Sequence, residues 1–168
     1  MPPRAARTLR LEPLNEDQER FIRTSGSVNE PLELQDPTEV LDPKRKAVMA
    51  ELQAENRPFW LIVHSGPLQE IDCLLVYAEE LRKLDHPEVR LVLISPKCPV
   101  GLATDVKWID FYPASLLFPL ADRVISGCGF NVIRQMKEHK HKHSVVPFAR
   151  RFDDQFRRAA RLAANGSA

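Results

Sequence analysis

The stretch ADRVISGCGFNVIRQMKEHKHKHSVVPFARRFDDQ, residues 121–155, decides the fold class. It opens with a short apolar run of strand length, residues 123–126, followed by a loop with two glycines. Residues 130–141 mix apolar and basic side chains in a pattern that predicts a helix, and 144–148 are a second apolar run. A closing helix is expected over 152–164. This succession of strand, helix, strand and helix is typical of a parallel sheet.

The same alternation extends back to residue 59. Residues 59–63, FWLIV, form a continuous apolar run of the kind found in strands buried on both faces. Residues 68–84 carry apolar side chains at helical spacing, 90–94 predict a second strand, and 106–111 a shorter third one. We therefore expect an α/β fold over residues 59–168, with a Rossmann-like parallel sheet that has helices on both faces.

Residues 1–58 have a different character, because prolines punctuate them throughout. They are expected to form a proline-rich N-terminal segment or linker. Residues 8–23 contain a weakly alternating run and then a charged, helix-prone one, and 24–37 are polar and predict a loop. Asp42-Pro43 has the pattern of an N-cap and first helical position, which predicts a helix over 44–55.

Composition restricts the function. The 168 residues carry a formal net charge of +1, so bulk charge gives no indication of a nucleic-acid partner or an anionic membrane surface. No transmembrane segment and no secretory signal are expected. The three cysteines lack metal-ligand spacing, and successive histidines of HKHKH, residues 139–143, are two residues apart and so do not share a helix face. No metal site is predicted, and a reducing, cytoplasmic setting is expected.

The loop SGCGFN, residues 126–131, is the first candidate site. Gly127 and Gly129 allow a ligand to come close to the backbone, and N–H groups at the start of the following helix suit a phosphate. The alternative is a plain strand-to-helix turn with Asn131 as the N-cap. Val132 stands where the third glycine of a dinucleotide fingerprint would fall. The earlier loop HSGP, residues 64–67, also lacks this fingerprint, so a nicotinamide cofactor is not expected.

RRFDDQ, residues 150–155, is the second candidate site. Asp154 and Gln155 are expected in the first turn of the last helix, at the sheet edge where ligands bind. A carboxylate beside an amide can hold two neighbouring sugar hydroxyls. The alternative is a set of acidic residues that stabilise a helix N-terminus. Arg150 and Arg151 face either a phosphate or solvent.

Together, SGCGFN and the later VVPFARRFDDQ resemble the C-terminal, donor-binding domain of GT-B-fold, UDP-sugar-dependent glycosyltransferases. The pattern is similar to that of the bacterial N-acetylglucosaminyl transferase that makes lipid II, and of the donor half of the dolichol-pathway UDP-GlcNAc transferase. It is close over residues 121–160 and looser over 59–110. The resemblance implies residues that flank the donor phosphates (His64, Ser65, Gly66), residues of the diphosphate site (Ser126, Gly127, Gly129, Asn131) and residues that bind the sugar (Asp154, Gln155).

Two departures qualify what the resemblance implies. Gln135 stands where the family has a glutamate that holds the ribose hydroxyls, and an amide binds a diol less strongly than a carboxylate does. GT-B enzymes also use two Rossmann-like domains, and this chain has room for one. The implied function is hexosyl transfer from a UDP-sugar, without a cofactor, which needs an acceptor-domain protein chain. The alternative is a non-catalytic or degenerate module for nucleotide binding or protein interaction.

Overall fold

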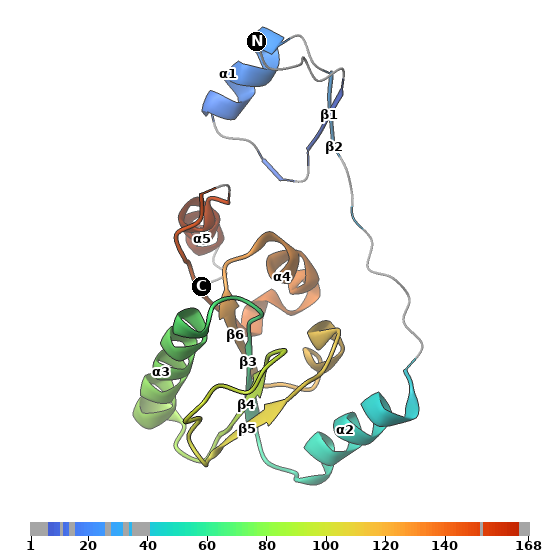
Figure 1. Cartoon of the computed structure of the whole chain (residues 1–168), viewed down its shortest axis with the longest axis vertical. Coiled ribbons are helices and arrows are strands. Elements are labelled where there is room, and N and C mark those ends of the chain that lie inside the picture. Colours follow the sequence, from blue (N-terminus) through green and yellow to red (C-terminus); the bar gives the residue numbers. More distant parts are fainter. Residues whose placement is uncertain are drawn as a thin grey trace. The chain divides into compact units, whose positions relative to one another are not determined.

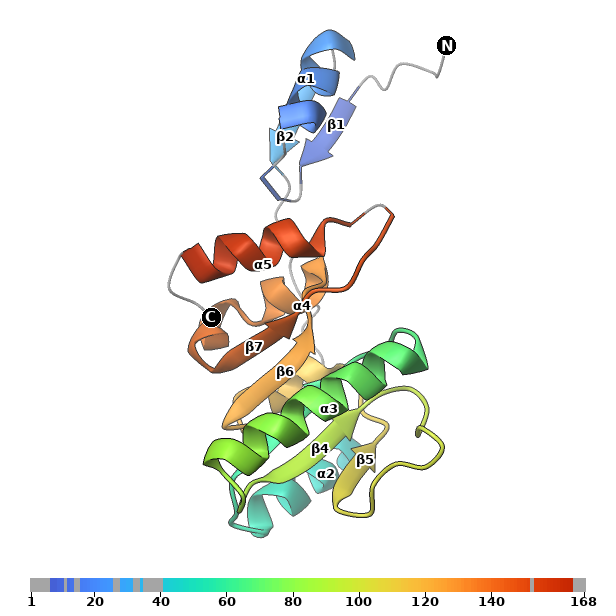
Figure 2. The same cartoon turned by 90° about the vertical axis from the view of Figure 1, so that its left-hand side faces the viewer.

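A computed structural model describes residues 7–10, 12–13, 16–25, 28–31, 34, 41–151 and 153–164. The chain divides into two compact units, Met1–Val40 and Leu41–Ala168. Figure 1 shows their elements, and Figure 2 shows them from a second direction. The boundary lies earlier than residue 58, so the helix expected over 44–55 belongs to the larger unit.

The smaller unit contains β1 (Arg7–Arg10), α1 (Glu16–Ser25) and β2 (Val28–Pro31). The two strands pair in parallel, with Arg7 opposite Val28. Acidic side chains occupy the first turn of α1 and Arg23 its last turn, which complements the helix dipole. Strand β2 falls within a stretch that the sequence predicts as a loop, because a four-residue strand carries too short a pattern to be recognised.

The larger unit is built on a five-stranded, fully parallel sheet of order β5-β4-β3-β6-β7. Numbered within the unit, the order is 3-2-1-4-5, which confirms the expected Rossmann-like α/β fold. The order reverses between β3 and β6, which are neighbours in the sheet. The strands are β3 (Phe59–Val63), β4 (Arg90–Ile94), β5 (Val106–Ile109), β6 (Arg123–Gly127) and β7 (His143–Val146).

Helices cover both faces of this sheet, as Figure 2 shows for α3 in front of the strands and α2 behind them. Alternate residues of β3 enter different cores: Phe59 and Leu61 lie in one, Trp60 and Ile62 in the other. The first core is closed by α2, η1 and α4, and the second by α3. The helices are α2 (Pro43–Ala54), α3 (Leu68–Asp85), η1 (Ala114–Leu117), α4 (Phe130–Gln135), η2 (Lys137–Lys142) and α5 (Gln155–Ala164).

The helix expected over 130–141 is wrong in its length. α4 ends at Gln135, and a 3₁₀ segment, η2, follows with a non-helical break at His139. Met136, which precedes η2, is the last side chain of this region that reaches the core, and no residue of η2 is buried. Without apolar side chains to pack on the sheet, the helix loses the tertiary contacts that support most helices in proteins.

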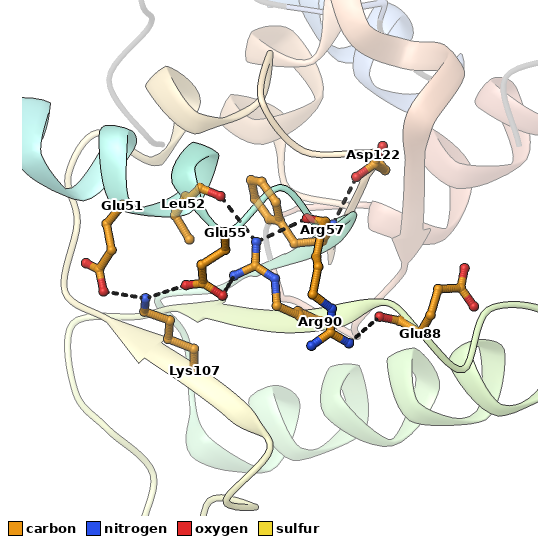
Figure 3. A network of polar contacts seen from close by, with 9 residues as sticks. Glu51, Leu52, Glu55, Arg57, Glu88, Arg90, Lys107 and Asp122 are labelled. Atoms are coloured by element: carbon orange, nitrogen blue, oxygen red, sulfur yellow. Dashed lines mark hydrogen bonds and ion pairs between the residues drawn. The ribbon is translucent and has the colours of Figure 1, made fainter.

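Helix α2 is tied to the amino-end edge of the sheet. The side chain of Asp42 accepts a hydrogen bond from the Arg45 N–H at 2.8 Å, which confirms the expected N-cap. At the other end of the helix, Arg90 donates to the carbonyl oxygens of Leu52 and Arg57, at 3.2 and 3.1 Å, and pairs with Glu55 (Figure 3). These contacts fix α2 against the start of β4, at the edge opposite the candidate site.

Candidate functional site

The candidate site lies at the carboxyl-end edge of the sheet, where β3 and β6 end side by side. Val63 of β3 is paired with Ser126 of β6, so the residues that follow, His64 and Gly127, are neighbours. The strand order reverses between these two strands. In open parallel sheets, such a reversal separates the loops on either side and leaves the crevice in which ligands bind.

Gly127 brings three loops together. A Cβ atom at this position would lie 3.3 Å from Cε1 of His64 and 3.3 Å from Cδ2 of Phe148. His64 follows β3 and Phe148 follows β7, so the absence of a side chain allows both rings to close on the glycine. A Cβ at Gly66 would lie 2.5 Å from Nε2 of His64, so a side chain there would force the ring to move.

The space above Gly129 is open. A Cβ atom there would have no heavy atom within 4 Å. Gly129 is also the N-cap of α4, and no side chain caps this helix end. Since α4 has only six residues, its dipole is short, and the open backbone of the loop matters more than the helix behind it. Asn131, in the first turn of α4, is exposed.

Ser126 faces the interior of the unit. Its side chain is 1% exposed, its Oγ lies 2.8 Å from Nε2 of His143, and it donates to the carbonyl oxygen of Gly127 at 2.9 Å. Burial lowers the pKa of His143 to about 4, so this imidazole is neutral near pH 7. The hydroxyl therefore joins β6 to β7 and supports the glycine loop from below.

A charged cluster borders the loops. Nε2 of His64 lies 2.7 Å from Oε2 of Glu70, in the first turn of α3, and Arg150 binds both oxygens of the same carboxylate. The hydrogen bonds from Arg150 lower the pKa of Glu70, and the carboxylate raises the pKa of Arg150. The His64 ring also packs against Phe148, with ring centroids 5.5 Å apart, while Ser65 beside it is exposed.

Residues 153–155, DDQ, lead into α5, and their side chains form hydrogen bonds within the protein. Gln155 is 5% exposed, and its Oε1 accepts a hydrogen bond from the Phe148 N–H at 3.1 Å. Its Nε2 donates to Asp153 at 3.2 Å. Asp154 is exposed, and its Oδ1 accepts from the Arg157 N–H at 3.0 Å, as an N-cap does. The helix begins at Gln155 because Asp154 caps it.

Arg158 connects α5 to the glycine loop. Its side chain is 5% exposed; Nη1 donates to the carbonyl oxygen of Cys128 at 2.6 Å, and Nη2 pairs with Asp153 at 2.5 Å. The N–H of Cys128 in turn donates to Val146, at 3.2 Å. A buried guanidinium thus holds the loop after β6, the loop after β7 and the last helix in one arrangement.

The structure brings several expected site residues together at one edge of the sheet. Other expected site residues bond within the protein instead. The loops that contain His64, Gly66 and Gly127 are in contact, and Gly129 is open beside them. By contrast, Ser126 and Gln155 use their side chains within the protein. Gln135 lies partly buried at the end of α4.

Sequence reasoning missed three residues of this edge: Glu70, Phe148 and Arg158. It left Arg150 open between phosphate and solvent. The contact between Glu70 and Arg150 joins positions 80 residues apart, and no local pattern signals such a pair. The one available signal was position, because Glu70 is the acidic residue in the first turn of the helix after the first strand of the sheet.

Comparisons with known proteins add no family. No protein-family model matches the chain, and no curated protein matches it by sequence. Within the described ranges, no group of three or more histidine, cysteine, aspartate or glutamate side chains is placed to hold a metal ion. None of the helices in the described part of the chain is both long enough and apolar enough to cross a bilayer.

Proposed function

We propose that this chain binds a nucleoside diphosphate-sugar, most simply a UDP-sugar, and supplies the donor-binding half of a glycosyltransferase. One observation carries the proposal: His64 and Gly127 are in contact at the point where the strand order reverses. Glycine-containing loops from the two central strands therefore meet at the edge where parallel sheets bind nucleotides. The sequence resemblance points to the same loops.

The open backbone at Gly129 is the proposed seat of the diphosphate. A ligand there can approach the main chain without meeting a side chain, since a Cβ at this position has no neighbour within 4 Å. In the proposed reaction, an acceptor displaces the diphosphate at the anomeric carbon of the sugar. The loop stabilises the negative charge that the departing diphosphate acquires. The catalytic base and the acceptor site are assigned to a separate acceptor-domain chain, in the cytoplasm.

A change in thermal stability tests the donor site. UDP that binds the folded state but not the unfolded state raises the melting temperature of the chain by linkage. At a UDP concentration a hundredfold above Kd, the stabilisation is about 2.7 kcal/mol. We expect Gly129→Leu to remove this shift by filling the open space, and the exposed Ala164→Leu at the end of α5 to retain it. If millimolar UDP leaves the melting temperature of the wild-type chain unchanged, the proposal fails.

A second function is favoured by Gln155. Both ends of its side-chain amide are bonded within the protein, to Phe148 and Asp153, so this residue is occupied before any sugar arrives. A chain that keeps the phosphate loop and loses sugar recognition acts as a nucleotide-binding module without transfer activity. Equal affinity for UDP and for a panel of UDP-sugars supports this reading, whereas a tenfold preference for one UDP-sugar supports the transferase.

A further inference from the structure

Arg150 lies in the loop that follows β7. Its guanidinium binds both carboxylate oxygens of Glu70 through Nη1 and Nη2, and Nη1 also donates to the carbonyl oxygen of Ala149 at 3.2 Å. These contacts use three of the five N–H groups of the arginine. The two that remain are Nε–H and the outer N–H of Nη2, which form no hydrogen bond with the described residues; the Asp153 carboxylate acts on the guanidinium through its charge.

These two N–H groups point in the same direction. Once the end of a guanidinium is bound to a carboxylate, Nε–H and the outer Nη2–H form a second fork along its side. Such a fork matches two oxygens of a phosphate, which is why arginine is common at phosphate sites. The Arg150 side chain is 32% exposed, so its fork can be reached from solvent.

Arg150 also lies beside the glycine loop. Its Cζ is 6.0 Å from the centre of the Phe148 ring, and that ring would be 3.3 Å from a Cβ on Gly127. Glu70 contacts His64, whose ring is the other neighbour of Gly127. Gly127, Phe148, Arg150, Glu70 and His64 therefore form a closed ring of contacts around the edge of the site.

We propose that Arg150 is a phosphate-binding residue of this site and that Glu70 is its positioning residue. The inference deepens the proposed function and rests on it for the identity of the nucleotide. Glu70 holds the end of the guanidinium and so orients the side fork before the ligand arrives, which lowers the ordering cost of binding. His64 provides the carboxylate with a second partner. The recognised chemistry is the β-phosphate of a nucleoside diphosphate, which carries the sugar in the proposed donor.

Titration calorimetry with four probes tests this inference: UDP, UMP, uridine and pyrophosphate. We expect Arg150→Gln to weaken UDP and pyrophosphate binding at least tenfold and to leave uridine binding unchanged. Arg150→Lys retains the charge without the fork and should weaken UDP several-fold. The exposed neighbour Arg151→Gln is the matched control and should bind all four probes as the wild type does.

Glu70→Gln separates positioning from direct contact. It should weaken UDP less than Arg150→Gln does, and the double variant should bind UDP no more weakly than Arg150→Gln alone. Equal UDP affinity in the wild type and Arg150→Gln overturns the inference and leaves the donor site standing. Tighter UDP binding by Glu70→Gln overturns the positioning role, because Glu70 would then mask the arginine. A third outcome is that the chain binds pyrophosphate through Arg150 as tightly as it binds UDP. This result overturns the nucleotide function but retains Arg150 as a phosphate-binding residue.

Discussion

Oγ of Ser126 lies 2.8 Å from Nε2 of His143, and both side chains are buried. The pair joins two neighbouring strands directly beneath the glycine loop, since Ser126 is paired with Val145 in the β6–β7 register. A neutral imidazole suits this position, because a buried charge without a counter-ion is strongly disfavoured.

Protonation of His143 should therefore destabilise the fold. Its pKa is lowered from 6.5 to about 4 by burial, so between these values the unfolded chain binds a proton that the folded chain does not. The contribution of the neutral His143 to the free energy of unfolding is fully present above pH 6.5. About 3 kcal/mol of it is lost as the pH falls to 4. Chemical denaturation across this range should show the loss in the wild type and in the exposed-histidine control His141→Gln. It should be much smaller in His143→Gln; an equal loss there would assign the pH dependence to other groups.

The two glycines of the loop should respond differently to alanine. At Gly127 the new Cβ would lie 3.3 Å from two ring atoms, so Gly127→Ala should lower the free energy of unfolding by about 1–2 kcal/mol through overpacking. At Gly129 the space is open and φ is −71°, so Gly129→Ala should change it by less than about 0.5 kcal/mol. Urea denaturation measures both. The opposite order of effects would mean that the loops do not converge on Gly127.

Arg158 should be the most important charged residue of α5 for stability. Its guanidinium is buried between Cys128 and Asp153, and its removal takes the cationic partner from a carboxylate and one donor from a buried carbonyl oxygen. Arg158→Gln should lower the free energy of unfolding by about 3 kcal/mol. The adjacent Arg157→Gln, on the exposed side of the helix, should lower it by less than about 0.5 kcal/mol. Similar losses in the two variants would contradict the buried clamp.

Arg90 should anchor α2 to the sheet. Its side chain is 13% exposed and bonds the carbonyl oxygens of Leu52 and Arg57 (Figure 3). Its guanidinium also packs 5.5 Å from the centre of the Phe59 ring. Arg90→Ala should lower the free energy of unfolding by about 2–3 kcal/mol. Lys107→Ala serves as the control, because its ion pairs are more exposed and should contribute less than about 1 kcal/mol. Hydrogen exchange in α2 should increase in Arg90→Ala alone.

Local pattern was sufficient for most of the larger unit. The apolar runs at 59–63 and 90–94 have the same bounds as β3 and β4, and the sequence order of strands and helices is that of the fold. A strand buried on both faces must be apolar throughout, so its pattern is strong even over five residues. The glycines at 127 and 129 also predicted a loop between the strand and the helix. At Gly127 two rings approach so closely that they leave little space for a side chain.

The directions of the side chains at the candidate site could not be predicted from the sequence. Ser126 belongs to the same alternating set as Val124, which faces the core, so the pleat of β6 turns its hydroxyl inward. Gln155 is held by the Phe148 N–H, a contact that depends on how the last loop folds back.

The sequence by itself determined a parallel α/β unit with a glycine-containing loop between β6 and α4. Its periodicity and its glycines act over a few residues and need no distant partner. Only the tertiary structure decided that Glu70 and Arg150 meet across 80 residues beside that loop. Such a pair forms when strand order and crossovers bring two loops to one edge of the sheet, and that placement depends on the packing of the whole unit.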